Sequence, residues 1–281
     1  MSLIVLTHNE EANLPTCLES VRSLGCRIFV VDSGSADRTV EIAEAAGASV
    51  VFHPFETQAA QLNWALAHLP STAEWVLRLD ADEWVTPALA EELSAKLNAL
   101  PADVTGLFIK RRVYFLGRWM RHGGYYPTWL LRAWRHGKAV CEDKLMDEHM
   151  VLLEGKPGRL EHDIVDENRK GLEFWIEKHN QFSTRWAKAH LMAQETDPGR
   201  EVEPSLWASQ EARKRWLKRN VYDRAPLFAR AAAFWFYRYW LRFGFLDGKE
   251  GLIFHFLQGF WYRFLIDAKV YEARERLKPP A

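Results

Sequence analysis

Three clusters of polar residues follow apolar segments within the first hundred residues. Their sequences are THNEE from Thr7, DSGS from Asp32 and DADE from Asp80. The third cluster holds three acids in four residues, a costly choice for a purely structural turn because like charges repel. Carboxylates spaced Asp-x-Asp suit Mg²⁺ or Mn²⁺, which take few carboxylates and complete their coordination with water and phosphate. Helix capping is the alternative, and it accounts for one such cluster more easily than for three.

The segments around these clusters alternate between apolar runs and amphipathic stretches. The pattern predicts four strands and four helices in strict alternation. The strands are expected at 3–7, 27–33, 48–53 and 74–80, and the helices at 13–25, 37–47, 57–69 and 86–100. This order predicts an α/β fold with a Rossmann-like, doubly wound, mostly parallel sheet. Ligands bind at the carboxyl ends of such strands, so the three clusters should form one site.

The rest of the chain has a different pattern. Residues 103–153 are irregular and strand-rich, a helix is expected from 171 to 193, and the chain is helical and aromatic after Pro204. We therefore predict a catalytic domain at 1–195 and a basic, aromatic helical extension at 196–281. The chain has neither GxGxxG after its first strand nor GxxxxGK[ST], which excludes a dinucleotide fingerprint and a P-loop.

Charge and cysteine content indicate the surroundings in which the protein works. Residues 1–100 hold 5 Lys and Arg against 14 Asp and Glu, and the remainder holds 32 against 23. The three cysteines form no CxxC pair, which favours free thiols in a reducing compartment over disulfides or a zinc site. The N-terminus lacks the pattern of a signal peptide. We therefore expect a cytoplasmic protein, or one on the cytosolic side of a membrane.

Four segments in order carry a resemblance to a known family. The segments LIVLTHNEEANLPTCLESV, VVDSGSADRTVEIAEAAGASV, QLNWAL and WVLRLDADEWV resemble the family 2 glycosyltransferases of the GT-A fold. The region from YYPTWLLRAW to HNQFSTRWA is similar to the branch that builds lipopolysaccharide core, capsule or exopolysaccharide. The resemblance implies an inverting transfer of one sugar from a nucleoside diphosphate sugar to a glycan or lipid-linked glycan.

The resemblance also implies residue roles. The donor-nucleotide residues would be Thr7, Asn9, Glu10, Asp32, Gln61 and Asp80, and the metal ligands would be Asp82, as the main one, and Asp80. A carboxylate such as Asp32 suits the imide of uracil but would also accept from guanine, so the base stays open. His162 is a further candidate ligand, although a lone histidine is more often a surface or core residue.

An inverting displacement needs one carboxylate to take the proton of the acceptor hydroxyl. The segment CEDKLMDEHM offers four: Glu148, which we favour, then Asp147, with Glu142 and Asp143 as further candidates. For any one of them, a solvated charge beside basic neighbours is an equally simple interpretation. No general acid is required, because a metal ion stabilises the diphosphate that leaves.

Two more segments indicate how the enzyme treats its acceptor: whether it adds one sugar or many, and which residues could contact the acceptor. Processive members of the family carry QxxRW, whereas Gln181 to Trp186 is one residue longer, which favours a non-processive enzyme. Residues 110–138 interleave Arg and Lys with aromatic residues, a composition suited to an acceptor flap or to ordinary packing.

The C-terminal region is rich in aromatic residues. Residues 226–271 hold 16 of them, and the longest charge-free run, 251–262, is too short to span a bilayer. With the basic segment at 213–224, this favours an in-plane helix pair at the anionic inner face of the cell membrane. Packing on the catalytic domain or on a second subunit is the alternative. The rival functions are a sugar-nucleotide pyrophosphorylase and a non-catalytic membrane scaffold.

Overall fold

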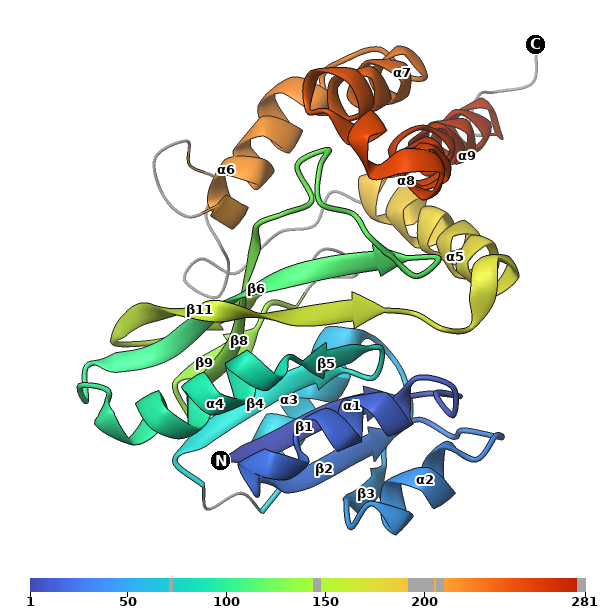
Figure 1. The fold of residues 1–281 in the computed structure, drawn as a ribbon. Helices are drawn as coiled ribbons and strands as arrows, with labels where there is room; N and C mark the ends of the chain where they lie inside the picture. The colour runs from blue at the N-terminus through green and yellow to red at the C-terminus, as the bar shows by residue number, and fades with distance from the viewer. Residues whose placement is uncertain (71–72, 144–147, 192–204, 206–209, 277–281) are drawn as a thin grey trace. The chain divides into compact units, whose positions relative to one another are not determined.

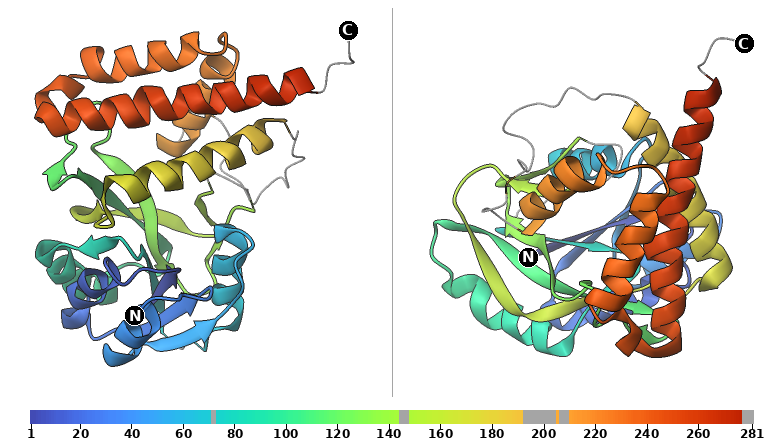
Figure 2. Two further views of the ribbon diagram at one scale, coloured as in Figure 1. Left: turned by 90° about the vertical axis from the view of Figure 1, so that its right-hand side faces the viewer. Right: turned by 90° about the horizontal axis from the view of Figure 1, so that it is seen from above.

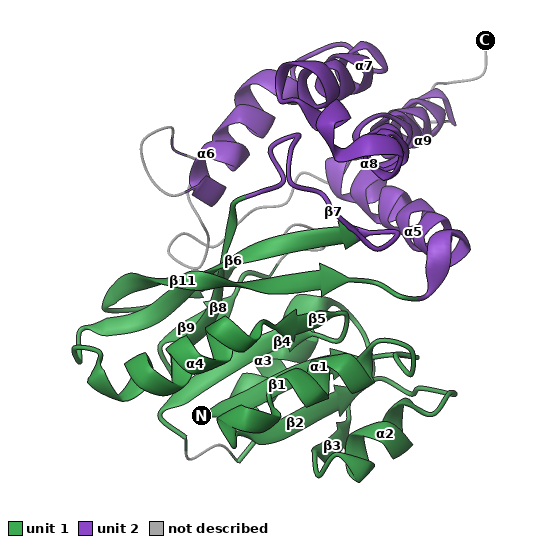
Figure 3. Cartoon of the chain, in the orientation of Figure 1, with its two compact units in different colours: residues 1–114, 127–169 green, residues 115–126, 170–281 purple. Residues whose placement is uncertain are grey.

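A computed structural model of the chain describes residues 1–281 except 71–72, 144–147, 192–204, 206–209 and 277–281. The described residues form two compact units, shown in Figure 3. Unit 1 comprises 1–114 and 127–169, and unit 2 comprises 115–126 and 170–281. The domain boundary at residue 195 stays a prediction, because compactness alone does not define a part that folds independently.

Unit 1 is built on a mixed sheet with the strand order β3-β2-β1-β4-β8-β6-β11-β5 (Figure 1). The bounds are β1 Ser2–Thr7, β2 Arg27–Asp32, β3 Ser49–Phe52, β4 Trp75–Asp80, β5 Glu83–Val85, β6 Val104–Phe115, β8 Thr128–Arg135 and β11 Lys156–Glu167. The first four strands are parallel, and β8 joins β4 and β6 in antiparallel fashion. The predicted class is thus confirmed: an α/β fold with a Rossmann-like parallel part in a mixed sheet and a C-terminal helical region.

Helices cover both faces of this sheet. Three of them, α1 (Leu14–Ser20), α2 (Thr39–Ala45) and α4 (Pro87–Lys96), share one hydrophobic core with the sheet, and α3 (Gln58–His68) shares the core on the other face. The central strands are covered by helices on both faces. Because both faces are buried, their sequences are nearly continuous runs of apolar residues. Thr86 caps α4 through its hydroxyl, which accepts from the backbone N–H of Leu89.

The irregular region at 103–153 contributes the long strands of the sheet and a small second sheet. The second sheet pairs β9 (Ala139–Cys141) with β10 (Met150–Leu152) in antiparallel fashion. All three cysteines are free, as predicted. Burial raises the pKa of the Cys141 thiol to about 12, so this thiol stays protonated near neutral pH.

Unit 2 contains the short strand β7 (Arg118–Trp119) and a set of helices. Their bounds are α5 Gly171–Leu191, α6 Gln210–Leu217, α7 Ala229–Phe236, α8 Gly248–Phe254 and α9 Tyr262–Arg276, with π-helical turns at Lys218–Tyr222, Tyr237–Leu241 and His255–Trp261. Helix α9 packs along α5 through Ala187, Tyr262, Ile266 and Val270, and Figure 2 shows these helices side by side. Within the described ranges, no helix is both long and apolar enough to cross a membrane.

Candidate active site

The register of the parallel strands brings the three polar clusters to one edge of the sheet. Thr7 at the end of β1 lies opposite Asp32 at the end of β2, and Leu6 lies opposite Asp80 at the end of β4. The residues that follow these strands therefore meet at the carboxyl end of the sheet. This edge is where ligands bind in open α/β sheets.

Asp32 organises the loop that follows β2. Its carboxylate accepts from the hydroxyls of Thr7 (2.8 Å) and Ser35 (2.5 Å) and from the backbone N–H groups of Gly34 and Ser35 (both 2.8 Å). Burial favours the protonated form of Asp32, but these four donors outweigh it and hold the pKa of the carboxyl below its usual value. A nucleobase contact would require Asp32 to exchange or share at least one of these bonds.

Asn9 and Glu10 hold the loop after β1. Asn9 adopts a left-handed backbone conformation (φ 55°), and its side-chain oxygen accepts from the N–H of Ala36 at 2.7 Å. The carboxylate of Glu10 accepts from the side chain of Asn13 at 2.7 Å. Gln61 lies deeper, only 2% exposed, with its amide directed at the backbone carbonyls of Val31 and His53. Gln61 therefore supports the wall of the site from within.

Asp80 and Glu83 belong to a network with buried arginines. Arg132 Nη2 lies 2.8 Å from Asp80 Oδ2 and 2.5 Å from Glu83 Oε1, and Arg78 Nη2 lies 3.0 Å from Asp80 Oδ1. Burial of Asp80 would raise its pKa, but the two guanidinium groups hold it well below the usual range. Glu83 is only 1% exposed, and burial, reinforced by the charge of Asp80, raises its pKa to about 7 despite its contact with Arg132.

Asp82 lies half-buried beyond the end of β4. Its carboxylate Oδ2 accepts from the side-chain amide of Asn168 at 3.1 Å, and its backbone carbonyl accepts from the N–H of Glu167 at 2.9 Å. Both partners come from the end of β11, which fixes the direction in which Asp82 points. Among the described residues, no group of three or more His, Cys, Asp or Glu stands ready to hold a metal ion.

The donor chemistry of Asp80 and Asp82 nevertheless fits Mg²⁺ or Mn²⁺. Both offer carboxylate oxygens, both are partly exposed, and ions of this kind usually take one or two protein carboxylates and fill the remaining positions with water and substrate phosphates. The two oxygens of Asp80 already face arginines, whereas Asp82 Oδ2 faces the neutral amide of Asn168. The fit is therefore better for Asp82 as the principal ligand.

Glu148 lies next to the acidic cluster. The side-chain amide of Gln58 has both hydrogen-bonding groups satisfied in one orientation. In that orientation its Nε2 donates to Glu148 Oε1 at 2.8 Å, and its own Oε1 accepts from Arg78 Nη2 at 2.6 Å. Gln58 thus connects Glu148 to the arginine that holds Asp80. Asp147, the second predicted base, lies outside the described residues.

The other two acids of this segment have different surroundings. Glu142 is fully buried and accepts from the backbone N–H of His149 at 2.9 Å, so it fixes the local backbone. Asp143 is exposed. Glu148 is therefore the acid of this segment that Gln58 connects to the acidic cluster, within the part that the structure describes.

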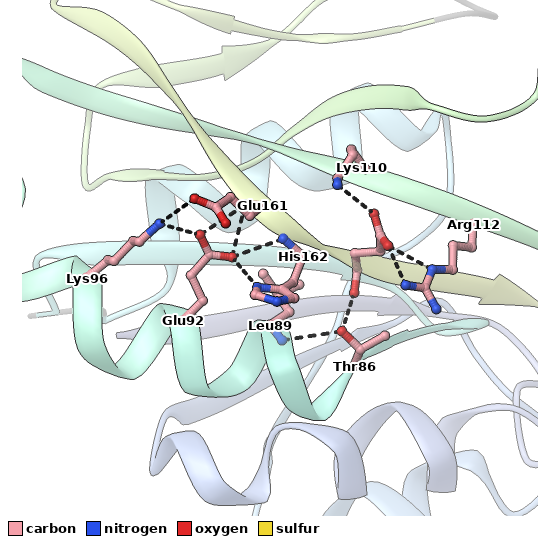
Figure 4. Close-up of polar contacts among 9 residues, drawn as sticks. Thr86, Leu89, Glu92, Lys96, Lys110, Arg112, Glu161 and His162 are labelled. Carbon is pink, nitrogen blue, oxygen red and sulfur yellow. Dashed lines mark hydrogen bonds and ion pairs between the residues drawn. The ribbon is translucent and has the colours of Figure 1, made fainter.

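His162 occupies a second polar cluster, between α4 and β11 (Figure 4). Its Nδ1 lies 2.9 Å from Glu92 Oε2, and Glu92 also accepts from the backbone N–H groups of Glu161 and His162 and from Lys96 Nζ. This cluster fastens an irregular turn of β11, where the register with β6 shifts between Arg159 and Asp163. Glu92 has several partners within the protein, so the geometry of this cluster is that of a structural cluster.

The arginines of the site had not been assigned a role from the sequence. Arg78 and Arg132 lie in strands that are otherwise buried and apolar, and each is less than 10% exposed. A charged residue inside such a run is rarely buried without a partner. The position of each arginine in an apolar strand was therefore the sequence signal that could have identified it as part of a polar network. Their carboxylate partners could not be deduced, because Arg132 reaches Asp80 only through the antiparallel addition of β8 to β4.

The fold and the site together are those of an α/β enzyme, with acids and arginines gathered at the carboxyl ends of parallel strands. The chain belongs to glycosyl transferase family 2, since residues 2–151 match the model of that family. It is accordingly a glycosyltransferase, which confirms the enzyme class predicted from the sequence.

Curated relatives match about a third of the chain. An uncharacterized glycosyltransferase of Rickettsia bellii is 36% identical over 93 residues, which cover 33% of this chain and 31% of the relative. A TPR repeat-containing protein of Synechococcus elongatus is 36% identical over 99 residues, covering 35% and 24% respectively. The match spans no more than about a third of either relative.

Two solved structures show limited similarity to this chain. TarS residues 1–349 of S. aureus give a TM-score of 0.48 at 15% identity, covering 100% of this chain and 92% of that chain. Glucosyl-3-phosphoglycerate synthase of Mycobacterium tuberculosis, in complex with Mn²⁺, uridine diphosphate and glucosyl-3-phosphoglycerate, gives 0.33 at 25% identity, covering 40% and 43%. Similarity at this level does not bear on the function of this protein.

Proposed function

We propose that the protein is an inverting, non-processive, metal-dependent glycosyltransferase. It would move one hexose from a nucleoside diphosphate sugar, with a UDP-sugar as the first donor to test, to a glycan or lipid-linked glycan of the bacterial envelope. The observation that supports this most strongly is the meeting of Thr7, Asp32 and the Asp80–Asp82 pair at adjacent strand ends, with Glu148 connected to them through Gln58.

The loops after β1 and β2 would receive the nucleoside. Thr7, Asn9, Glu10 and Asp32 border this part of the edge, and Gln61 would support it from below. Their mutual hydrogen bonds keep the loops in one arrangement before the donor arrives. A preformed pocket loses less conformational entropy on binding than a mobile one.

Asp82, assisted by Asp80, would hold Mg²⁺ or Mn²⁺ together with the donor diphosphate. When bound, the metal ion would supply Lewis-acid stabilisation of the departing diphosphate. Arg78 and Arg132 fix the carboxylate of Asp80 between them and would add positive charge close to the diphosphate. The site can therefore offset the charge that develops on the leaving group without a protonated acid.

Glu148 would accept the acceptor proton. The acceptor hydroxyl oxygen bonds to the anomeric carbon while the bond from that carbon to the diphosphate oxygen breaks, and the hydroxyl proton passes to the carboxylate. A single displacement of this kind inverts the anomeric configuration. Asp147 is the second candidate for this role.

Donor turnover tests the proposal. The full chain is incubated with UDP-, GDP- and dTDP-sugars, with and without Mn²⁺, and both nucleoside diphosphate release and thermal stabilisation are measured. We expect one donor class to stabilise the protein, more strongly with Mn²⁺, and to be turned over. Release of pyrophosphate from a nucleoside triphosphate and a sugar phosphate would instead identify a pyrophosphorylase, and no binding of any donor would favour a non-catalytic scaffold.

The variant Asp82→Ala sharpens this test. It should abolish turnover and remove the Mn²⁺-dependent part of donor stabilisation, while the fold survives because Asp82 is partly exposed. Glu44→Ala, which removes an exposed acid on α2, is the matched control and should keep both. A full Mn²⁺ response in Asp82→Ala would overturn the metal assignment.

A further inference from the structure

The outer surface of the helical hairpin of unit 2 is almost entirely apolar. The hairpin, residues 225–264, runs out along α7 and returns along α8 and the start of α9. Its large exposed hydrophobic side chains are Phe236, Tyr237, Trp240, Leu241, Phe243, Phe245, Leu246, Leu252, Ile253, Phe256 and Phe264. Arg242 and Lys249 are the exposed charged residues of this segment. Its one partly exposed carboxylate, Glu250, is paired with Arg118 at 3.5 Å.

The charged groups that the hairpin does contain are mostly turned inward. Arg230 forms a buried ion pair with Asp267, at 2.5 Å between Nη2 and Oδ1. Asp247 is buried and accepts from the backbone N–H of His122 at 3.0 Å. The guanidinium group of Arg238 lies over the ring of Tyr125 at 4.1 Å. The hairpin thus has polar groups inside and apolar groups outside, the reverse of a water-facing helix pair.

The aromatic residues of the hairpin form connected rows, in which the partly exposed Phe260 joins two exposed rings. The ring centroids of Phe256 and Phe260 are 5.5 Å apart, and those of Phe260 and Phe264 are 5.6 Å apart. At the turn of the hairpin, Phe245 lies 5.8 Å from Trp240 and 6.1 Å from Phe243. Scattered apolar residues are normal on a protein surface, but connected groups of this kind indicate a binding surface.

We propose that this surface inserts into one leaflet of a lipid bilayer, with the hairpin lying in the plane of the membrane. Its outgoing arm, 229–241, is about 20 Å long at 1.5 Å per residue, shorter than the hydrocarbon core of about 30 Å. Trp240 and Tyr237 suit the interface, where an apolar ring and a polar group are both satisfied. Arg242 and Lys249 can extend to anionic headgroups, and the charge of the partly exposed Glu250 is offset by its ion pair with Arg118.

This inference deepens the proposed function, because an enzyme that glycosylates a lipid-linked acceptor has its acceptor in the membrane. The biological purpose of membrane binding rests on the proposed function, whereas the physical argument for membrane binding rests only on the surface of the hairpin. Vesicle binding is measured without donor or acceptor, so failure of insertion and failure of transfer are distinguished.

The test is flotation of the full chain with vesicles of phosphatidylcholine, alone or mixed with phosphatidylglycerol. The variant is Leu241→Gln/Leu246→Gln, which removes two exposed leucines but keeps helix-compatible side chains. Leu153→Gln is the matched control, since Leu153 is similarly exposed but belongs to unit 1. We expect both vesicle types to bind the protein, the double variant to lose roughly 10- to 30-fold in partition, and the control to bind like wild type.

Salt and self-association distinguish insertion from electrostatic surface binding and from dimerisation. At about 1 M NaCl, where the Debye length is about 3 Å, binding should persist in part because its apolar component is not screened. Complete loss in salt with no effect of the leucine variant would overturn insertion in favour of the basic segment at 213–224. A dimer in solution that the leucine variant dissociates, without vesicle binding, would overturn it in favour of a second copy, and a monomer that binds no vesicle would also overturn it.

Discussion

The edge of the sheet in unit 1 and the helical hairpin in unit 2 both contain a buried ion pair of arginine and carboxylate, but the two pairs have different roles. In unit 1, Arg132 binds Asp80 and Glu83 at the border of a site, and Asp80 remains partly exposed. In unit 2, Arg230 binds Asp267 with both side chains almost completely buried. The first pair orients a carboxylate that can still meet a ligand, whereas the second joins two helices.

The difference shows how ionisable groups should be interpreted. A buried ion pair contributes little net stability by itself, because desolvation of the two charges offsets their attraction. It does fix geometry, and its location decides what that geometry serves. In unit 2 the inward pairs leave apolar side chains to form the outer surface. In unit 1 the pairs fix Asp80 in the site for which we propose Asp82 as metal ligand and Glu148 as base.

The largest effect is expected at Glu148. Glu148→Gln keeps the size of the side chain and its hydrogen bonding but cannot take a proton, so transfer should fall roughly 10²- to 10⁴-fold. Donor affinity should change little, because a base of this kind contacts the acceptor. Calorimetry with the donor and single-turnover transfer with a competent acceptor measure the two quantities.

Variants of neighbouring acids make the Glu148 test specific. Asp143→Asn removes the charge of an exposed acid in the same segment and should leave transfer near normal. If Glu148→Gln is active and Asp147→Asn is not, the base is Asp147. Activity in both would make the segment structural.

The two ion pairs can be broken in parallel. Arg132→Met and Arg230→Met should each destabilise the protein by about 3–5 kcal/mol, since each removes the cation in closest contact with a buried carboxylate, Glu83 or Asp267. Arg132→Met should also lower the donor affinity of the molecules that remain folded, because Asp80 loses one of the two arginines that hold it. Arg230→Met should leave that affinity unchanged. Urea unfolding and donor titration measure these effects, and equal donor affinity in the two variants would contradict the distinction.

The Glu92 cluster predicts a pH-dependent stability. Burial alone would raise the pKa of Glu92, but bonds from Lys96, from His162 and from the N–H groups of β11 lower it to about 2, against 4.5 for the unperturbed group. The unfolded chain therefore binds the proton more readily than the folded one. The stabilisation is complete above about pH 4.5 and is lost as the pH falls towards 2, with a magnitude on the order of 3 kcal/mol.

Glu92→Gln tests this window. The variant should be less stable than wild type at neutral pH, and the difference should shrink between pH 4.5 and 2. Urea midpoints at several pH values measure it. A constant difference across that range would show that Glu92 acts through packing and not through its charge.

The smallest effects concern the turn at 123–124 in unit 2. Both glycines have positive φ, 67° at Gly123 and 76° at Gly124, so alanine at either position costs about 1 kcal/mol of backbone strain. A Cβ on Gly123 would also lie 2.0 Å from His255 Cε1, whereas one on Gly124 would meet its nearest atom, in Arg242, at 3.6 Å. Gly123→Ala should therefore lower the melting temperature more than Gly124→Ala, and equal shifts would contradict this packing.

By itself, the sequence determined the parallel part of the sheet and the edge at which the site lies. Short apolar runs and capped helices are local signals, and the carboxyl ends of parallel strands must meet, so Thr7, Asp32 and Asp80 could be grouped without a structure. The pairing of Arg78 and Arg132 with Asp80, the burial of Glu142 and the attachment of His162 to Glu92 depend on residues that are far apart in the chain.

Tertiary structure alone decided those contacts, because hydrogen-bond partners follow from strand order and register, which local propensity does not encode. The same holds for unit 2. Its aromatic composition was evident from the sequence, but a helix pattern does not say which face meets a neighbour. Only the packing of 115–126 and α5 against the hairpin showed that its charges lie inside and its apolar residues outside.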